Sequence, residues 1–215
     1  LFRSPRDPLP EIPEALHWVN RHGRLRLADL RGRVVLVVFW NATSTSSTNL
    51  LGELRQLERK HPDEFVLLGV HTPRYASQQP DVVVLKALQR IRLRAPVVND
   101  PEGLAWMLYS IPAWPTTLLI DAEGQLAARF VGEGRAPEIE DAVTRLQEGL
   151  PPAHVRPPPD LLENARAETA GPLAFPAHVL VNDWRLFVSD TGPHRILECS
   201  HDGRVLRQFG LGTPG

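Results

Sequence analysis

Alternating strand and helix patterns between residues 34 and 147 constrain the fold of this chain more than any other feature. Apolar runs predict buried strands, and apolar residues spaced along one face predict helices. The expected strands are 34–40, 65–71, 96–99, 116–121 and 125–131, and the expected helices are 47–60, 81–92, 102–109 and 137–147. Helices between successive strands favour parallel pairing, whereas the closing hairpin adds antiparallel strands. The sequence therefore predicts an α/β fold with a mixed central sheet flanked by helices.

The two ends of the chain differ in pattern from this region. Prolines punctuate residues 1–13, which are predicted to be an extended lead, and a short hairpin is expected within 16–30 around Arg21-His22-Gly23. A proline-rich stretch at 151–171 predicts a stiff linker. Four short strand patterns then follow, at 179–181, 185–189, 195–199 and 205–209. We therefore predict an α/β domain over 14–150 and a small all-β region over 172–215.

The motif Trp114-Pro115-Thr116, which precedes an apolar strand, narrows the α/β domain further. Upstream, Phe39-Trp40 ends the first apolar strand, and a hydroxyl-rich loop at 41–48 leads into a helix. This arrangement resembles a thioredoxin-like domain, in which a cis-proline loop faces a Cys-x-x-Cys motif at a helix start. The resemblance implies a thioredoxin-like fold, a cis bond before Pro115, and an origin among thiol-disulfide oxidoreductases that serve cell redox homeostasis.

The all-β region resembles one NHL repeat, which forms a blade of a β-propeller. The matching residues lie at 175–176, 188–192, 194–196 and 202–205. Together with Gly69-Val70-His71, Val98-Asn99-Asp100 and Gly132-Glu133-Gly134, they make the chain resemble the family that joins a thioredoxin-like domain to an NHL propeller. Because propellers need about four to eight blades, we expect the propeller to be truncated here after one blade. Exposed edge strands tend to pair. We therefore expect the blade to pack on its own α/β domain or on another chain, and the second case includes self-association through the exposed edge of the blade.

The resemblance places the family's nucleophilic cysteine at Ser44 and its resolving cysteine at Ser47, counted from Phe39. A helix N-terminus lowers the pKa of a thiol there, and a second thiol one turn along resolves the mixed disulfide. A serine hydroxyl forms no disulfide, so the chain is expected to be redox-inactive at this site. Many relatives also carry a buried carboxylate before the Phe-Trp pair, where this chain has Val38.

Two explanations of the serines stay open: they are native, or two cysteines were replaced. The resemblance also implies that Trp40, Trp114, Pro115 and Thr116 contact a protein or peptide partner, because a cis-proline loop offers backbone groups to an extended segment. The alternative function is therefore a non-catalytic binding module that uses this groove and the propeller. A serine nucleophile at Ser44 would need a base such as His71, and capping of the helix is the favoured explanation.

Composition argues against several other classes of function. The net charge of -1 and the pI near 6.8 predict no binding to nucleic acid or to an anionic membrane. We expect no cofactor and no metal, because no phosphate-binding glycine motif occurs, and neither His17 with His22 nor Cys199 with His201 has zinc-site spacing. Cys199 is the only cysteine, which favours a reducing compartment and predicts a cytoplasmic protein. The chain begins at Leu1, so an exported form with a removed signal stays open.

Overall fold

The computed structural model describes residues 9–21, 23–62, 64–148, 150, 173, 176–182, 184–190 and 195–210. Contacts divide the chain into two compact units, Leu1–Arg166 and Ala167–Gly215, called unit 1 and unit 2. The predicted linker at 151–171 lies outside the described residues, as do 1–8 of the predicted lead and His22. Phe175, 191–192 and His194 of the NHL match lie outside them too.

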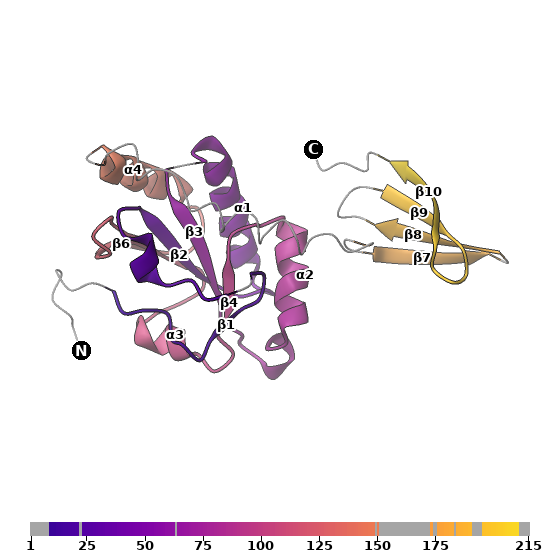
Figure 1. The fold of residues 1–215 in the computed structure, drawn as a ribbon, viewed down its shortest axis with the longest axis horizontal. Coiled ribbons are helices and arrows are strands. Elements are labelled where there is room, and N and C mark those ends of the chain that lie inside the picture. The colour runs from indigo at the N-terminus through magenta and orange to yellow at the C-terminus, as the bar shows by residue number, and fades with distance from the viewer. Residues whose placement is uncertain are drawn as a thin grey trace. The chain divides into compact units, whose positions relative to one another are not determined.

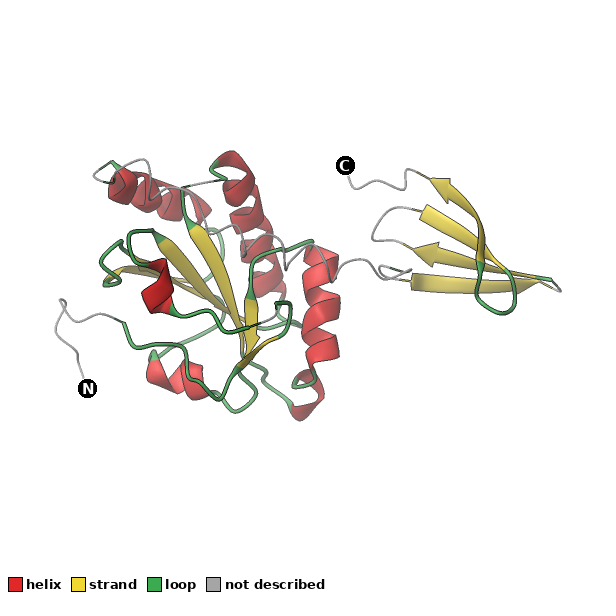
Figure 2. Cartoon of the chain, viewed as in Figure 1, coloured by secondary structure: helices red, strands yellow, loops and turns green. Residues whose placement is uncertain are grey.

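Unit 1 is a mixed sheet of six strands with helices on both faces (Figures 1 and 2). The strands are β1 (His17–Trp18), β2 (Val35–Trp40), β3 (Val66–His71), β4 (Val97–Asn99), β5 (Thr116–Ile120) and β6 (Leu126–Val131). The helices are α1 (Thr45–Lys60), α2 (Asp81–Ile91), α3 (Leu104–Leu108) and α4 (Ala136–Gln147), with short 3-10 helices η1 (Leu27–Leu30) and η2 (Ala76–Gln78). Each predicted helix and strand from 34 to 147 is present, with ends that agree within two residues.

The strand order is β1-β4-β3-β2-β5-β6, with β2, β3 and β4 parallel and the other pairs antiparallel. Alternate residues of β2 point to opposite faces of the sheet. Leu36, Val38 and Trp40 pack with α1, α2 and α4, whereas Val35, Val37 and Phe39 pack with η1 and α3. Both faces of the central strands are therefore buried, which explains why these strands read as continuous apolar runs.

The predicted hairpin within 16–30 is wrong. β1 pairs with β4 instead, and 27–30 form the 3-10 helix η1. The buried side chain of Asn20 extends the pairing, because its amide donates to the Ala95 carbonyl at 2.8 Å and its oxygen accepts from the Val97 N–H at 2.8 Å. This segment therefore completes the sheet rather than folding back on itself.

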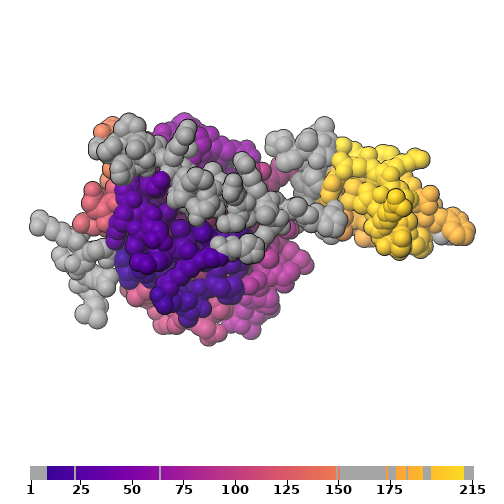
Figure 3. Space-filling model, viewed as in Figure 1, coloured from indigo at the N-terminus to yellow at the C-terminus, as the bar shows by residue number. Residues whose placement is uncertain are grey.

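Unit 2 is an antiparallel sheet of four strands in the order β10-β9-β8-β7. The strands are β7 (Pro176–Asn182), β8 (Arg185–Asp190), β9 (Arg195–Cys199) and β10 (Val205–Gly210). Among its described residues, few are buried: Val188, Leu197 and Cys199 form a small apolar cluster, and buried Asp190 accepts from the Arg195 guanidinium at 2.9 Å. Every residue of β10 is exposed, and this strand forms much of the visible yellow surface in Figure 3. The four strands predicted from the sequence are present.

Candidate functional site

The register of the sheet brings the two predicted halves of the site to one edge. β2 ends at Trp40, and its neighbour β5 begins at Thr116, which lies opposite Phe39. The chain after β2 therefore leaves the sheet beside the loop that enters β5. The predicted site segments, 41–48 and 114–116, are adjacent for this reason.

Ser44 and Ser47 hold the first turn of α1 together. Ser44 is the N-cap residue, and its hydroxyl oxygen accepts a hydrogen bond from the Ser47 N–H at 3.2 Å. Ser47 is fully buried, and its hydroxyl accepts from the Asn41 N–H at 3.2 Å. Such a cap satisfies backbone donors that a helix start otherwise leaves unpaired. The two serines thus have a structural role in addition to their predicted position in the site.

Asn41 and Gln78 fix the loop that precedes α1, a role that the sequence did not predict. The Asn41 amide donates to the Thr72 carbonyl and to the Gln78 side-chain oxygen, each at 3.0 Å. Its oxygen accepts from the N–H and the hydroxyl of Thr43, at 3.0 and 2.9 Å. The Gln78 amide also donates to the Thr43 hydroxyl at 2.7 Å. Because both amide side chains are buried, this network ties the loop firmly to β3 and η2.

The loop before β5 carries the predicted proline and tryptophan. The Trp114–Pro115 peptide bond is cis, Pro115 is buried, and the Thr116 hydroxyl donates to the Ala113 carbonyl at 2.7 Å. The Trp114 ring packs on the ring of Trp106, with centroids 4.6 Å apart. Trp114 remains partly exposed beside the loop.

A third loop, residues 132–134, links these two halves. The Gly132 N–H donates to the Pro115 carbonyl at 2.8 Å. The Glu133 carboxylate accepts from the Ser46 hydroxyl at 2.8 Å and from the Asn49 amide at 2.7 Å. The sequence offered this loop only as a family motif, without a role for Glu133. The structure makes it the bridge between the proline loop and the start of α1.

Trp40 and His71 are fully buried beneath this edge, so neither side chain faces solvent. Their rings meet edge to face at a centroid distance of 5.2 Å. Gly69 admits the indole, since a Cβ there would lie 3.2 Å from Trp40 Nε1. Trp40 is thus a core residue under the site, and its predicted contact with a partner is not direct in this conformation.

His71 is not placed as a base for Ser44. Its Nδ1 lies 3.0 Å from the Asn99 side-chain oxygen, and its Nε2 has no partner. The Asn99 amide donates elsewhere, to Gln79 and Asp81, so its oxygen must accept from His71 Nδ1–H. Burial lowers the pKa of His71, against smaller opposing effects of Asn99, Asp100 and Asp81. His71 is therefore a neutral, structural histidine, and no hydrogen bond joins it to Ser44 among the described residues.

The position of the family's buried carboxylate is apolar here. Val38 is fully buried and lies opposite Gly69 on one side and Thr117 on the other. In the part of the chain that the structure describes, no group of three or more histidine, cysteine or acidic side chains could hold a metal ion. Nor does any described helix have the length and hydrophobicity to cross a bilayer.

Comparison with known proteins identifies the relatives of this fold. The model of the AhpC/TSA family matches residues 8–129. The chain is 30% identical over 191 residues to Protein SUPPRESSOR OF QUENCHING 1, chloroplastic, of Arabidopsis thaliana, covering 85% of this chain and 18% of that protein. It is 27% identical over 227 residues to NHL repeat-containing protein 2 of Gallus gallus, covering 94% and 29% of the two chains.

Two further similarities cover a smaller share of the chain. Thiol-disulfide oxidoreductase ResA of Bacillus cereus is 22% identical over 123 residues, which cover 57% of this chain and 69% of that protein. The solution structure of a thioredoxin-like protein in the oxidized form matches with a TM-score of 0.62 at 19% identity, covering 69% of this chain and 100% of that chain. The predicted thioredoxin-like fold is thereby confirmed. The chain spans only 18% and 29% of the length of the first two relatives.

Proposed function

Because this chain belongs to the AhpC/TSA family, we propose that its thioredoxin-like unit binds extended polypeptide segments without exchanging electrons with them. The chain resembles thioredoxin-like thiol-disulfide oxidoreductases, and it is homologous to NHL repeat-containing protein 2 over most of its length. In this proposal, the unit has the peptide-binding groove of such proteins but no thiol chemistry.

The hydrogen bonds of Ser44 and Ser47 carry this proposal. Both hydroxyls stand where the family's dithiol would stand: the Ser44 hydroxyl caps α1, and the Ser47 hydroxyl accepts from the Asn41 N–H in the preceding loop. Cys199, the only cysteine of the chain, is buried in unit 2, and a single cysteine cannot form a dithiol. Neither serine can form a disulfide, so a segment that docks here is held by non-covalent contacts alone.

The proline loop supplies the binding surface in this proposal. Extended segments bind such loops through backbone hydrogen bonds, with side chains placed in neighbouring pockets. Trp114 is partly exposed, and three apolar residues of the adjacent helix α3 are also exposed: Leu104 by 39%, Met107 by 65% and Leu108 by 46%. Scattered exposed apolar residues are common, and the contact between Trp106 and Trp114 places α3 beside the loop. We propose that apolar side chains of the bound segment pack on Trp114.

Unit 2 has a separate place in the proposal, as one blade of an NHL-type propeller. Its edge strand β7 exposes Val179 by 59%, Leu180 by 66% and Val181 by 62%, so both faces of the sheet carry uncovered apolar side chains. A blade in a propeller covers these faces by stacking on its neighbours. Further blades in a longer chain would supply that cover.

The test is binding of an unfolded chain that has no free thiol. Reduced, carbamidomethylated ribonuclease A, an unfolded basic chain, is titrated into the 15N-labelled protein, and amide shifts are followed by NMR. We expect shifts at 43–48, 113–116 and 132–134, and weaker binding by Trp114→Ala. The matched control is Trp184→Ala, which removes a tryptophan that is 78% exposed in unit 2. Absence of shifts at all three segments would refute the proposed binding.

A further inference from the structure

The loop 132–134 holds a carboxylate on the wall of the proposed groove. Gly132 and Gly134 adopt φ values of 93° and 73°, which non-glycine residues rarely adopt. These two conformations turn the chain so that Glu133 points back to α1 while the Gly132 N–H reaches Pro115. The carboxylate therefore lies against the start of α1, which is one wall of the groove, while the backbone of its loop contacts the proline loop, which is the other wall.

Glu133 is ionised and already ordered. Its hydrogen bonds from Asn49 and Ser46 hold the pKa of the exposed carboxyl below its usual value. The same two bonds fix the rotamer of a side chain that would otherwise be mobile. A partner therefore loses less conformational entropy on binding it than on binding a free surface glutamate.

Among the described residues, no cation pairs with the Glu133 carboxylate. Both of its hydrogen-bond donors are neutral. The nearest cation along the chain, Arg135, pairs with Glu138 at 2.6 Å. A helix N-terminus carries only about half a positive charge, so it offsets part of the carboxylate charge. A carboxylate offers about four acceptor positions, and Ser46 and Asn49 use two of them.

We infer that Glu133 makes the proposed groove selective for polypeptide segments that place a lysine or arginine beside residues 46–49. The inference rests on the proposed peptide binding. An ordered, uncompensated carboxylate with free acceptor positions is complementary to a basic side chain and repels an acidic one. Arg90 donates to the Ala42 carbonyl at 3.4 Å, so a positive charge lies near the loop that precedes α1. The expected preference for basic side chains therefore applies beside Glu133 and not to the whole groove.

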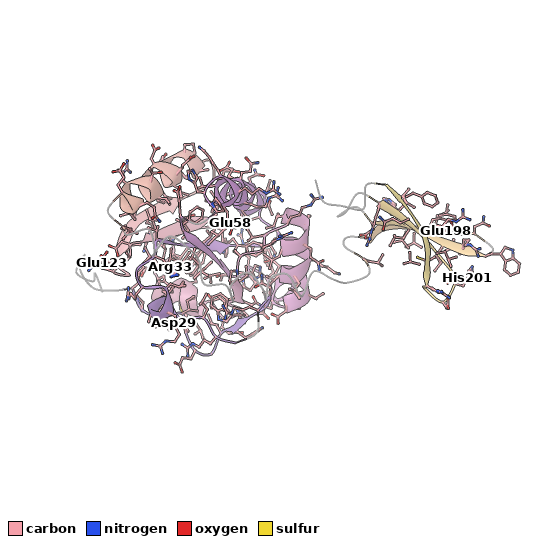
Figure 4. The ribbon with its side chains drawn as sticks, turned by 45° about the horizontal axis from the view of Figure 1, so that its top comes forward. Asp29, Arg33, Glu58, Glu123, Glu198 and His201 are labelled. Atoms are coloured by element: carbon pink, nitrogen blue, oxygen red, sulfur yellow. The ribbon has the colours of Figure 1, made fainter. Side chains whose placement is uncertain are left out.

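Selection from a random peptide library tests the inference. Cysteine-free 12-residue peptides on phage are selected against the whole chain, against Glu133→Gln, and against Glu123→Gln. Glu123, which is labelled in Figure 4, follows β5 in the turn to β6, whereas Pro115 precedes β5, so Glu123→Gln removes a like charge at the opposite end of that strand. The strongest peptide and its Lys→Gln counterpart are then compared by fluorescence anisotropy at 50 and 500 mM NaCl, concentrations chosen around the range where screening becomes strong.

Lysine and arginine are expected to be enriched by the unsubstituted chain and by Glu123→Gln, but not by Glu133→Gln. Each decisive basic residue should tighten binding up to about fivefold at low salt, and the difference should shrink at high salt. Two results would overturn the inference and leave peptide binding intact. Either the selected peptides bind without enrichment of lysine and arginine, or Glu133→Gln enriches these residues equally. If no peptide is selected, the proposed binding fails and the inference fails with it. If circular dichroism shows that Glu133→Gln is unfolded, the salt dependence of peptide binding by the unsubstituted chain tests the inference instead.

Discussion

Replacing Ser44 and Ser47 by cysteine should turn this chain into a working thiol-disulfide reductase. The two positions are three residues apart at the start of α1. Helix geometry places their Cα atoms about 5 Å apart. A disulfide needs about 4.4–6.8 Å, so the pair can close and open without movement of the backbone. The scaffold therefore already has the spacing that the chemistry requires.

The start of α1 should also make the thiol at position 44 acidic. The Ser47 N–H now donates to the side chain of residue 44 at 3.2 Å, and it would donate to a thiolate in the same place. A helix N-terminus stabilises a negative charge by about 0.3–1 kcal/mol, and by about 2 kcal/mol in partly buried sites. Since about 1.4 kcal/mol is a tenfold change, the thiolate fraction should rise about two- to thirtyfold. Glu133, bonded to Ser46, opposes this effect, so adding Glu133→Gln should raise the fraction further.

The assay is the reduction of insulin by dithiothreitol, followed by turbidity. We expect catalysis above the dithiothreitol background by Ser44→Cys/Ser47→Cys and none by the unsubstituted chain. The matched control is Thr45→Cys/Thr48→Cys, which has the same spacing one residue further along α1. Equal rates for the two double variants would refute the argument from position. No activity in either would show that the surrounding site no longer supports dithiol chemistry.

Three predictions concern stability, each measured from urea unfolding. Ser44→Ala removes the α1 cap and should lower the free energy of unfolding by about 0.5–2 kcal/mol; an unchanged midpoint would contradict the capping role. Gly69→Ala places a Cβ 2.7 Å from Val97 and should destabilise by about 1–3 kcal/mol, whereas Gly52→Ala, in open space on α1, should stabilise by about 1 kcal/mol. The reverse order would contradict the packing argument. Hydrogen bonds to Glu64 and Glu140 raise the pKa of His61. The stability that protonated His61 contributes is therefore complete below about pH 6.5 and is lost as the pH rises through the raised pKa. His61→Gln should remove that pH dependence. If the free energy of unfolding of His61→Gln varies with pH in parallel with that of the unsubstituted chain, the assigned role of His61 is refuted.

The sequence predicted where the candidate site lies, but not the contacts that hold it. Short contiguous motifs contain the predicted residues Ser44, Ser47, Trp114 and Pro115, so these could be recognised without the structure. The contacts that fix them could not. Asn41 and Gln78 are 37 residues apart, and Ser46 and Glu133 are 87 residues apart. No local pattern records which distant polar side chains will meet.

By itself, the sequence determined the order and kind of the elements in unit 1, because apolar periodicity is a local property that burial on one or two faces imposes. The tertiary structure alone decided that β1 pairs with β4 across about 80 residues, where a local hairpin was predicted. It also decided that Trp40 and His71 lie in the core and that Glu133 reaches the start of α1. Each of these outcomes depends on strand register and on close packing between segments distant in sequence, and these are settled only when the sheet assembles.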